Sequence, residues 1–216
     1  MKKYFGLLTL VISISFASCD KDTVDDSGAI YGCIDENALN FNSSATDDNG
    51  SCEYSVSYLA SGDWTITYLE YDTEIDLSVI DASILDAISP GLSLIVGALG
   101  AIPVEGSADD AGSYSLSLDD NSYTSDLSFT TEPISIVTFE IPGLPINLAS
   151  SGTWSVQNSE TEILFVDEAT STQQLYEIVN LSSDFALLRG ALIIAQEIPG
   201  LGLYEFEVEL ELTLEK

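Results

Sequence analysis

The chain has 216 residues and a formal charge of −31 at pH 7, because 36 acidic side chains face only five basic ones. A field of this sign repels polyanions, so we expect no nucleic-acid partner. The sequence contains no histidine, which excludes a Ser-His-Asp triad and histidine metal sites, and we expect no enzymatic activity. A carboxylate pair of the glycosidase type is the catalytic route left open.

Residues 1–18 have the features of a secretory signal peptide. Two lysines give a basic start, Phe5 to Ala17 carries no charge, and small residues precede Cys19. The uncharged run is shorter than the roughly 20 residues that a helix needs to cross a bilayer. The sequence Phe16-Ala17-Ser18-Cys19 resembles the lipobox of bacterial lipoproteins, which implies cleavage before Cys19 and a covalent lipid on that residue. An ordinary cleaved signal is the alternative.

We interpret residues 19–30 as a lipidated acidic tether. Its start, Asp20-Lys21-Asp22, resembles the acidic export signal of Bacteroidetes surface lipoproteins. That resemblance implies a protein held by its lipid in the outer membrane and displayed at the cell surface. A plain acidic tether without an export function is the alternative.

Residues 31–55 form a short segment around the two remaining cysteines, Cys33 and Cys52. An even pair outside the cytoplasm is expected to be oxidised, and closing such a loop stabilises it by about 3 kcal/mol in the chain-entropy model. Five oxygen-bearing side chains between the cysteines suit Ca²⁺, although their spacing differs from an EF-hand. They could instead be turn formers. The candidate ligands are Asp35, Asn40, Asn42, Asp47 and Asp48.

The run from Gly32 to Tyr54 resembles the short GC-D…N-x-N…DDGSC repeats found beside lipoboxes and in surface proteins of marine Bacteroidetes. Thrombospondin type 3 repeats look related and bind calcium, which is why the resemblance implies a Ca²⁺ site. Phe41 stands where those repeats usually have tyrosine.

The sequence pattern of residues 56–216 predicts a single all-β domain of antiparallel strands. The strand nearest the C-terminus is the clearest, because apolar residues from Tyr204 to Leu214 alternate with glutamates, as a strand with one buried face requires. In the first strand, the alternation places Trp64, Ile66 and Tyr68 on one face. About nine runs bounded by turn residues fit this pattern. They are 62–71, 113–118, 123–130, 134–141, 152–157, 162–166, 174–181, 185–194 and 203–214.

Two segments, Ser61-Gly62-Asp63-Trp64 and Ser151-Gly152-Thr153-Trp154, repeat a Gly-x-Trp theme. Together with Tyr176 to Leu187 they resemble the lipocalin-like lipoprotein domains of Bacteroidetes. The resemblance implies an up-and-down barrel of about eight strands over residues 56–216, of a kind associated with hydrophobic ligands. In such a barrel we expect Trp64 and Trp154 to plug a barrel end, with ligand contact as their second role.

A long insertion, roughly residues 75–112, follows the first strand and departs from that family pattern. Its first half has apolar residues at helical spacing, and its second half, Leu92 to Ile102, is apolar and glycine-rich. We expect an amphipathic helix packed on the barrel; a lid, a plug or a loop that dips into a bilayer are the alternatives. Three Pro-Gly-Leu turns would form an apolar rim if they met at one end. The candidate barrel-end or ligand residues here are Leu92, Leu94, Leu144 and Leu201.

Two functions follow from these patterns. The first is a surface-anchored lipoprotein whose barrel binds a hydrophobic small molecule or lipid. The alternative is a structural or adhesive cell-surface protein with a filled barrel and a calcium-dependent acidic surface. A barrel of about eight strands leaves room either for side chains or for one small ligand, so the packing of the interior decides between the two.

Overall fold

The computed structural model describes residues 28–76, 78, 81–136, 139–198 and 202–216. Cys19, the predicted signal peptide at residues 1–18 and Leu201 lie outside the described residues. The chain divides after Tyr54 into two compact units, and the second unit runs from Ser55 to Lys216. In the described part of the chain no helix is long and apolar enough to cross a membrane.

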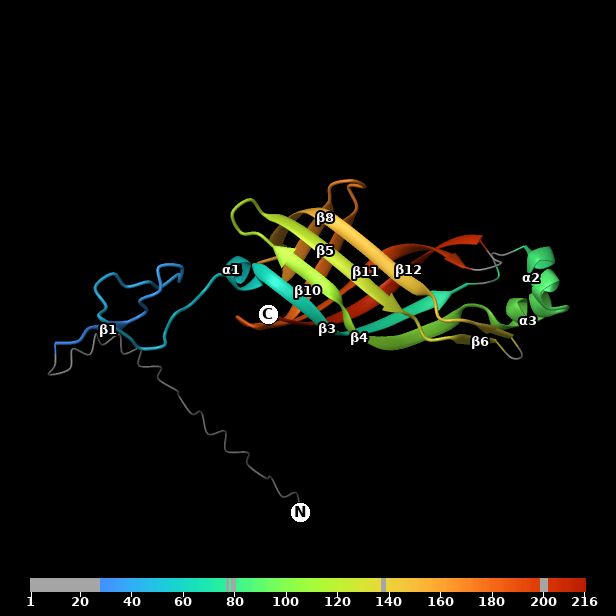
Figure 1. Ribbon diagram of the computed structural model, residues 1–216, viewed down its shortest axis with the longest axis horizontal. Helices are drawn as coiled ribbons and strands as arrows, with labels where there is room; N and C mark the ends of the chain where they lie inside the picture. Colours follow the sequence, from blue (N-terminus) through green and yellow to red (C-terminus); the bar gives the residue numbers. More distant parts are fainter. Residues whose placement is uncertain (1–27, 77, 79–80, 137–138, 199–201) are drawn as a thin grey trace, which may run out of the picture. The chain divides into compact units, whose positions relative to one another are not determined.

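The second unit is built around a closed barrel of eight antiparallel strands (Figure 1). Each strand pairs with the next along the chain, and the last pairs with the first, which confirms the predicted up-and-down barrel. The strands are β3 (Gly62–Ile75), β4 (Ile102–Leu116), β5 (Ser122–Thr130), β8 (Pro145–Gln157), β9 (Glu162–Asp167), β10 (Gln173–Leu181), β11 (Phe185–Ile198) and β12 (Gly202–Glu215).

On β12, apolar residues that point into the barrel alternate with glutamates that point out of it. Val208, Leu210, Leu212 and Leu214 are almost completely buried, whereas the glutamates between them point outward. The inward side chains of all eight strands join one hydrophobic cluster. The free energy gained by burying this apolar surface offsets the conformational entropy that the chain loses on folding.

A bulge in β3 corrects one prediction from the sequence. The pairing of β3 with β12 shifts between Ile66 and Tyr68, so Thr67 is an extra residue on β3 relative to β12. Beyond this β-bulge the inward positions fall on Leu69 and Tyr71, and Tyr68 is 37% exposed. Strict alternation, which placed Tyr68 on the buried face, fails because a bulge moves the following residues to the opposite face.

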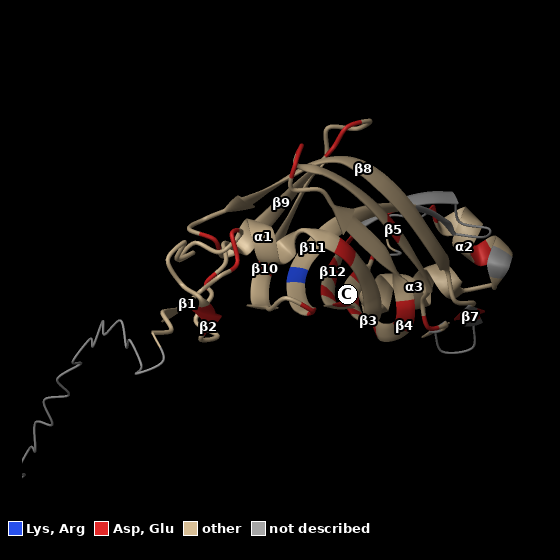
Figure 2. Ribbon diagram, turned by 60° about the vertical axis from the view of Figure 1, so that its left-hand side comes forward, with Lys and Arg blue, Asp and Glu red and all other residues tan. Residues whose placement is uncertain are grey.

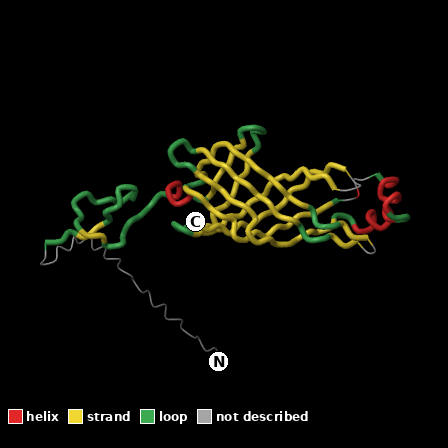
Figure 3. Tube along the Cα trace, viewed as in Figure 1, coloured by secondary structure: helices red, strands yellow, loops and turns green. Residues whose placement is uncertain are grey.

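Helices lie at the two ends of the barrel (Figure 3). Helix α1 (Val56–Ala60) precedes β3 at one end, called here the α1 end. At the other, the α3 end, α2 (Ala82–Ile88) and α3 (Leu92–Leu99) fill the connection between β3 and β4. Gly91, with φ 84°, makes the turn between them, a conformation that favours glycine.

The structure revises the extent of two predicted segments. Pairing of β3 with β4 continues as far as Ile75 and Ile102, so the insertion covers residues 76–101 and not 75–112. Sequence patterns missed the first half of β4 because glycines and two aspartates interrupt its alternation. The predicted strand 134–141 is instead a small hairpin of β6 (Ile134–Ile136) and β7 (Phe139–Ile141), outside the barrel sheet.

Candidate functional site

The barrel interior, the place where a ligand was expected, holds a cluster of aromatic rings. Phe165 is at its centre and is 1% exposed. Its ring centroid lies 5.3 Å from that of Tyr114, 4.9 Å from that of Tyr123 and 5.8 Å from that of Tyr176. These separations are typical of packed aromatic pairs. Side chains therefore occupy the middle of the barrel.

A small cavity remains near the α1 end, with a volume of about 20 Å³. It is lined by apolar parts of ten residues, Trp64 and Phe165 among them. This volume is close to the space of a single water molecule, whereas pockets for small molecules measure roughly 300–1,000 Å³. This cavity does not accommodate a lipid or a similar ligand.

The hydroxyl of Tyr176 is fully buried and makes no hydrogen bond of normal geometry with the described residues, although the phenol of Tyr114 lies close enough to interact with it. Burial raises the pKa of Tyr176 well above its usual value and raises the pKa of Tyr114 to about 12, so both phenols stay protonated at physiological pH. An unsatisfied buried hydroxyl costs about 1–3 kcal/mol.

Removing that hydroxyl is expected to stabilise the barrel. Tyr176→Phe keeps the ring and deletes only the unpaired oxygen, so we expect the free energy of unfolding to rise by about 1 kcal/mol. Urea denaturation followed by tryptophan fluorescence measures the change. Tyr123→Phe is the matched control, because the Tyr123 hydroxyl forms a hydrogen bond with Ser150 Oγ at 2.6 Å. Loss of that hydrogen bond is expected to lower the free energy of unfolding of the barrel. A decrease in stability on Tyr176→Phe would mean that the hydroxyl has a partner.

Both predicted tryptophans lie at the α1 end and are 3% exposed. Trp64 Nε1 donates to the carbonyl of Ala60 at 2.7 Å, and Trp154 Nε1 donates to the carbonyl of Ser117 at 2.9 Å. Their ring nitrogens are thus bonded to the backbone that closes this end. The geometry gives them a packing role at one and the same end of the barrel.

The C-terminal residue completes this closure. Lys216 Nζ lies 4.4 Å from the centroid of the Trp64 ring and donates to the carbonyl of Leu59 at 3.0 Å. The ammonium group therefore combines a cation–π contact with a bond to the last turn of α1.

At the α3 end, Leu92 and Leu144 are 4% and 3% exposed and belong to the barrel core. Leu85 and Val96 join the same cluster from α2 and α3. Leu94, in contrast, is 79% exposed on α3. Two Pro-Gly-Leu turns lie in connections at this end, but their leucines are buried and form no exposed rim; the third turn, at residues 199–201, lies outside the described residues.

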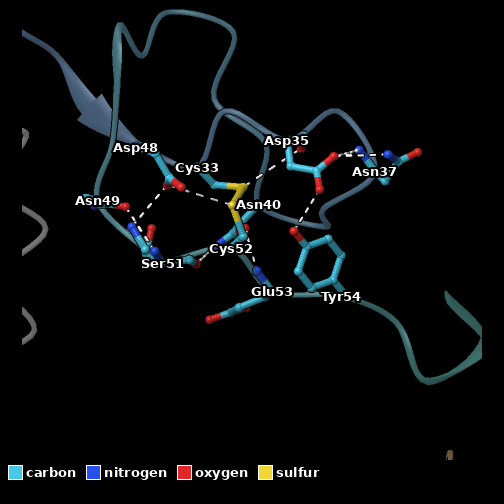
Figure 4. The surroundings of a disulfide bond; sticks show 11 residues. Cys33, Asp35, Asn37, Asn40, Asp48, Asn49, Ser51, Cys52, Glu53 and Tyr54 are labelled. Carbon is cyan, nitrogen blue, oxygen red and sulfur yellow. Dashed lines mark hydrogen bonds between the residues drawn. A yellow bond between two sulfur atoms is a disulfide. The ribbon is translucent and has the colours of Figure 1, made fainter. Parts of the chain in front are cut away.

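The first unit is organised by the disulfide between Cys33 and Cys52, which confirms the predicted pairing (Figure 4). Two short strands, β1 (Tyr31–Gly32) and β2 (Asp47–Asp48), pair in parallel beside it. Cys33 is 1% exposed and its Cα atom lies 4.8 Å from that of Cys52.

The candidate calcium ligands use their oxygens to shape this loop. Asp35 accepts from Asn37 N at 2.9 Å and from the Tyr54 hydroxyl at 2.7 Å, and the bond from Asn37 N is the main cause of its lowered pKa. Asn40 Oδ1 accepts from Glu53 N. The others bond in the same way: Asn42 Oδ1 accepts from Ser44 N, Asp47 Oδ2 from Thr46 Oγ1 and Asp48 Oδ1 from Gly50 N.

Four of the five candidates thus accept a hydrogen bond from a backbone N–H, which is typical of turn formers. Among the described residues, no three acidic or cysteine side chains come together in a way that could hold a metal ion. Calcium binding by this segment therefore stays a prediction of the sequence, and the geometry favours the turn-former interpretation.

Acidic residues are frequent along β12, β3 and β4 (Figure 2), and Glu70, Asp72, Glu105 and Glu209 among them are exposed. Glu209 pairs with Asp72, which in turn pairs with Glu105 on the next strand, so three acids lie side by side. Like charges in such positions are destabilising. A hollow of about 420 Å³ lies over these strands, and one basic residue, Arg189, reaches it and pairs with Glu211.

The fold and its interior define a closed, lipocalin-like β-barrel at the level of architecture. Comparison with known proteins adds nothing to this, since no family model, curated protein or solved structure matches the chain.

Proposed function

We propose that this chain is a lipid-anchored, extracytoplasmic protein whose barrel is a packed scaffold, and which acts through its outer surface without catalysis. The aromatic cluster around Phe165 is the observation that carries the proposal, because it fills the volume in which a ligand would sit. Core residues of α1, α2 and α3 join the same cluster and support a barrel closed at both ends.

Binding of a hydrophobic small molecule is the competing function, and the eight-stranded barrel architecture is what favours it. A ligand of a few hundred Å³ would need the rings of Tyr114, Phe165 and Tyr176 to move out of the positions that they occupy. Packed interiors resist such changes. The filled barrel is therefore the stronger proposal.

The anchoring part of the proposal rests on the lipobox-like sequence before Cys19. A lipid at this position places the chain on a membrane, and an acidic surface on the remaining residues disfavours close contact with anionic head groups. Divalent cations from the medium would screen this surface, which is how calcium would act in a structural or adhesive role.

Metabolic labelling with radioactive palmitate tests the anchor. The protein with its own leader is expected to incorporate label and to be removed from intact cells by added protease. Cys19→Ser is expected to abolish labelling and to block maturation at this site, whereas Cys33→Ser leaves labelling unchanged. Equal labelling of the Cys19→Ser variant would refute lipidation, and protection from protease would refute surface display.

A further inference from the structure

The short hairpin of β9 and β10 leaves part of the barrel wall unpaired. The pairing of β10 with β11 ends at Tyr176 and Gly190, and the pairing of β8 with β9 begins only at Gly152. β11 continues beyond this point to Ile198, paired with β12 alone (Figure 1). Residues 191–198 therefore present a free strand edge, and no described backbone hydrogen bond reaches it from the side opposite β12.

The side chains of residues 191–195, the first part of this edge, are uncharged, and Glu197 is the one acidic residue in 191–198. Leu192 and Ile194 point into the core and are 6% and 1% exposed, while Ile193 points outward and is 69% exposed. Ala191 and Ala195 lie on the same outward face as Ile193. An exposed strand edge without charges, such as residues 191–195, is a template for pairing with another chain.

An unpaired edge on β4, in the same sheet, is protected by charge. β4 pairs with β5 only from Gly112 onward, so its residues 102–111 are also paired on one side. That edge carries the exposed acids Glu105, Asp109 and Asp110, which discourage strand pairing. Of the unpaired edges on β4 and β11, therefore, the first is blocked by charge and the second is left open.

Charges on β12 indicate what would pair with the open edge. Glu209, Glu207 and Glu205 lie directly across from Ala191, Ile193 and Ala195. None of these glutamates has a basic partner among the described residues, where Arg189 pairs with Glu211 and Lys216 contacts Trp64.

A strand added to β11 would lie about 10 Å from β12, twice the spacing between strands. The two alanine side chains are short, so a lysine or arginine of the added strand could extend across them to the glutamates. A second copy of this chain is disfavoured as the added strand, because it brings a net charge of −31 and further glutamates.

We propose that residues 191–198 of β11 bind an extended segment of a partner protein, in which apolar residues alternate with lysine or arginine, by strand addition. The inference rests on the proposed function, because it names the kind of partner that the outer surface takes. Main-chain hydrogen bonds to β11 supply affinity, and the glutamate row supplies selectivity for basic side chains.

Fluorescence anisotropy with a labelled peptide tests this proposal on the soluble chain from Asp20 onward. The probe is a peptide of about eight residues, a typical strand length, with valine and lysine alternating. Binding is expected, and it should fall at least about tenfold when the valine nitrogens are methylated, since one row of donors is lost. A peptide with glutamate in place of lysine is expected not to bind.

Matched protein variants locate the site. Ile193→Lys places a charge on the free edge beside Glu207 and is expected to weaken peptide binding at least about tenfold. Val179→Lys makes the same change of charge at a 42% exposed position on β10, away from the free edge, and is expected to bind the peptide normally. Hydrogen exchange should slow at amides of residues 191–195 when the peptide is bound.

Three results would overturn strand addition. They are equal binding of the methylated peptide, equal binding by the Ile193→Lys variant, and self-association of the chain through Ile193 in place of peptide binding. Each of these results would leave the proposal of a packed barrel standing. A ligand inside the barrel would be detected by native mass spectrometry of the chain, and not by the binding of a peptide to its outer edge.

Discussion

Replacing Phe165 with alanine is expected to lower the free energy of unfolding of the barrel by about 3–5 kcal/mol. Phe165 contacts three other aromatic rings at the centre of the interior, so its removal loses both buried apolar area and ring contacts. The surrounding strands are held by the closed barrel and cannot collapse into the space. Urea denaturation followed by tryptophan fluorescence measures the loss.

Leu175→Ala is the matched control for this substitution. Leu175 lies on the neighbouring strand β10, next to Gln174, which is the residue that pairs with Phe165. The Leu175 side chain is 44% exposed on the outer face. Its truncation is expected to change stability by about 0.5 kcal/mol or less. If Phe165→Ala also cost less than about 1 kcal/mol, the ring would not be packed and the interior would be loose enough for a ligand.

Removal of the disulfide is expected to unfold the first unit and leave the barrel intact. The structure describes only two buried hydrophobic residues in this unit, Cys33 and Ala38, so the loop has almost no core of its own. Without the bond between Cys33 and Cys52, the unit loses about 3 kcal/mol of stabilisation. In the Cys33→Ser, Cys52→Ser double variant, amide hydrogens of residues 31–54 are expected to exchange as in an unfolded peptide.

The melting temperature of the barrel is the internal control for the double variant. It is expected to stay unchanged, because the chain divides into separate compact units after Tyr54. Retained protection in the disulfide-free loop would contradict the structural role of the bond and would revive the case for a stabilising calcium ion.

Sequence patterns predicted the architecture because alternation and turn residues are local signals. The alternating glutamates of β12 predicted both its inner face and its length to within a residue or two. A β-bulge, in contrast, is not visible in the sequence of one strand, because it is defined by the pairing with a partner strand. Thr67 is an extra residue only in relation to the partner strand β12, so the inward position of Tyr71 could not be predicted from β3 alone.

The state of the interior was beyond the reach of sequence patterns. Alternation identifies inward side chains but not whether rings from opposite strands meet. Gly190 illustrates this, because a Cβ atom at that position would lie 2.6 Å from Cδ1 of Tyr176. A glycine on β11 thus makes room for a ring from β10, a relation that only the paired strands reveal. Similarly, the free edge of β11 follows from the short neighbouring hairpin and not from its own sequence.

Native mass spectrometry of the chain from Asp20 onward, produced without residues 1–19, tests the packed barrel most directly. A barrel filled by its own side chains predicts the bare mass of the chain, shifted at most by calcium and returned to the bare value by a chelator. A reproducible extra mass of a few hundred daltons that survives purification would contradict the packed barrel, and its extraction would identify the ligand class of a hollow one.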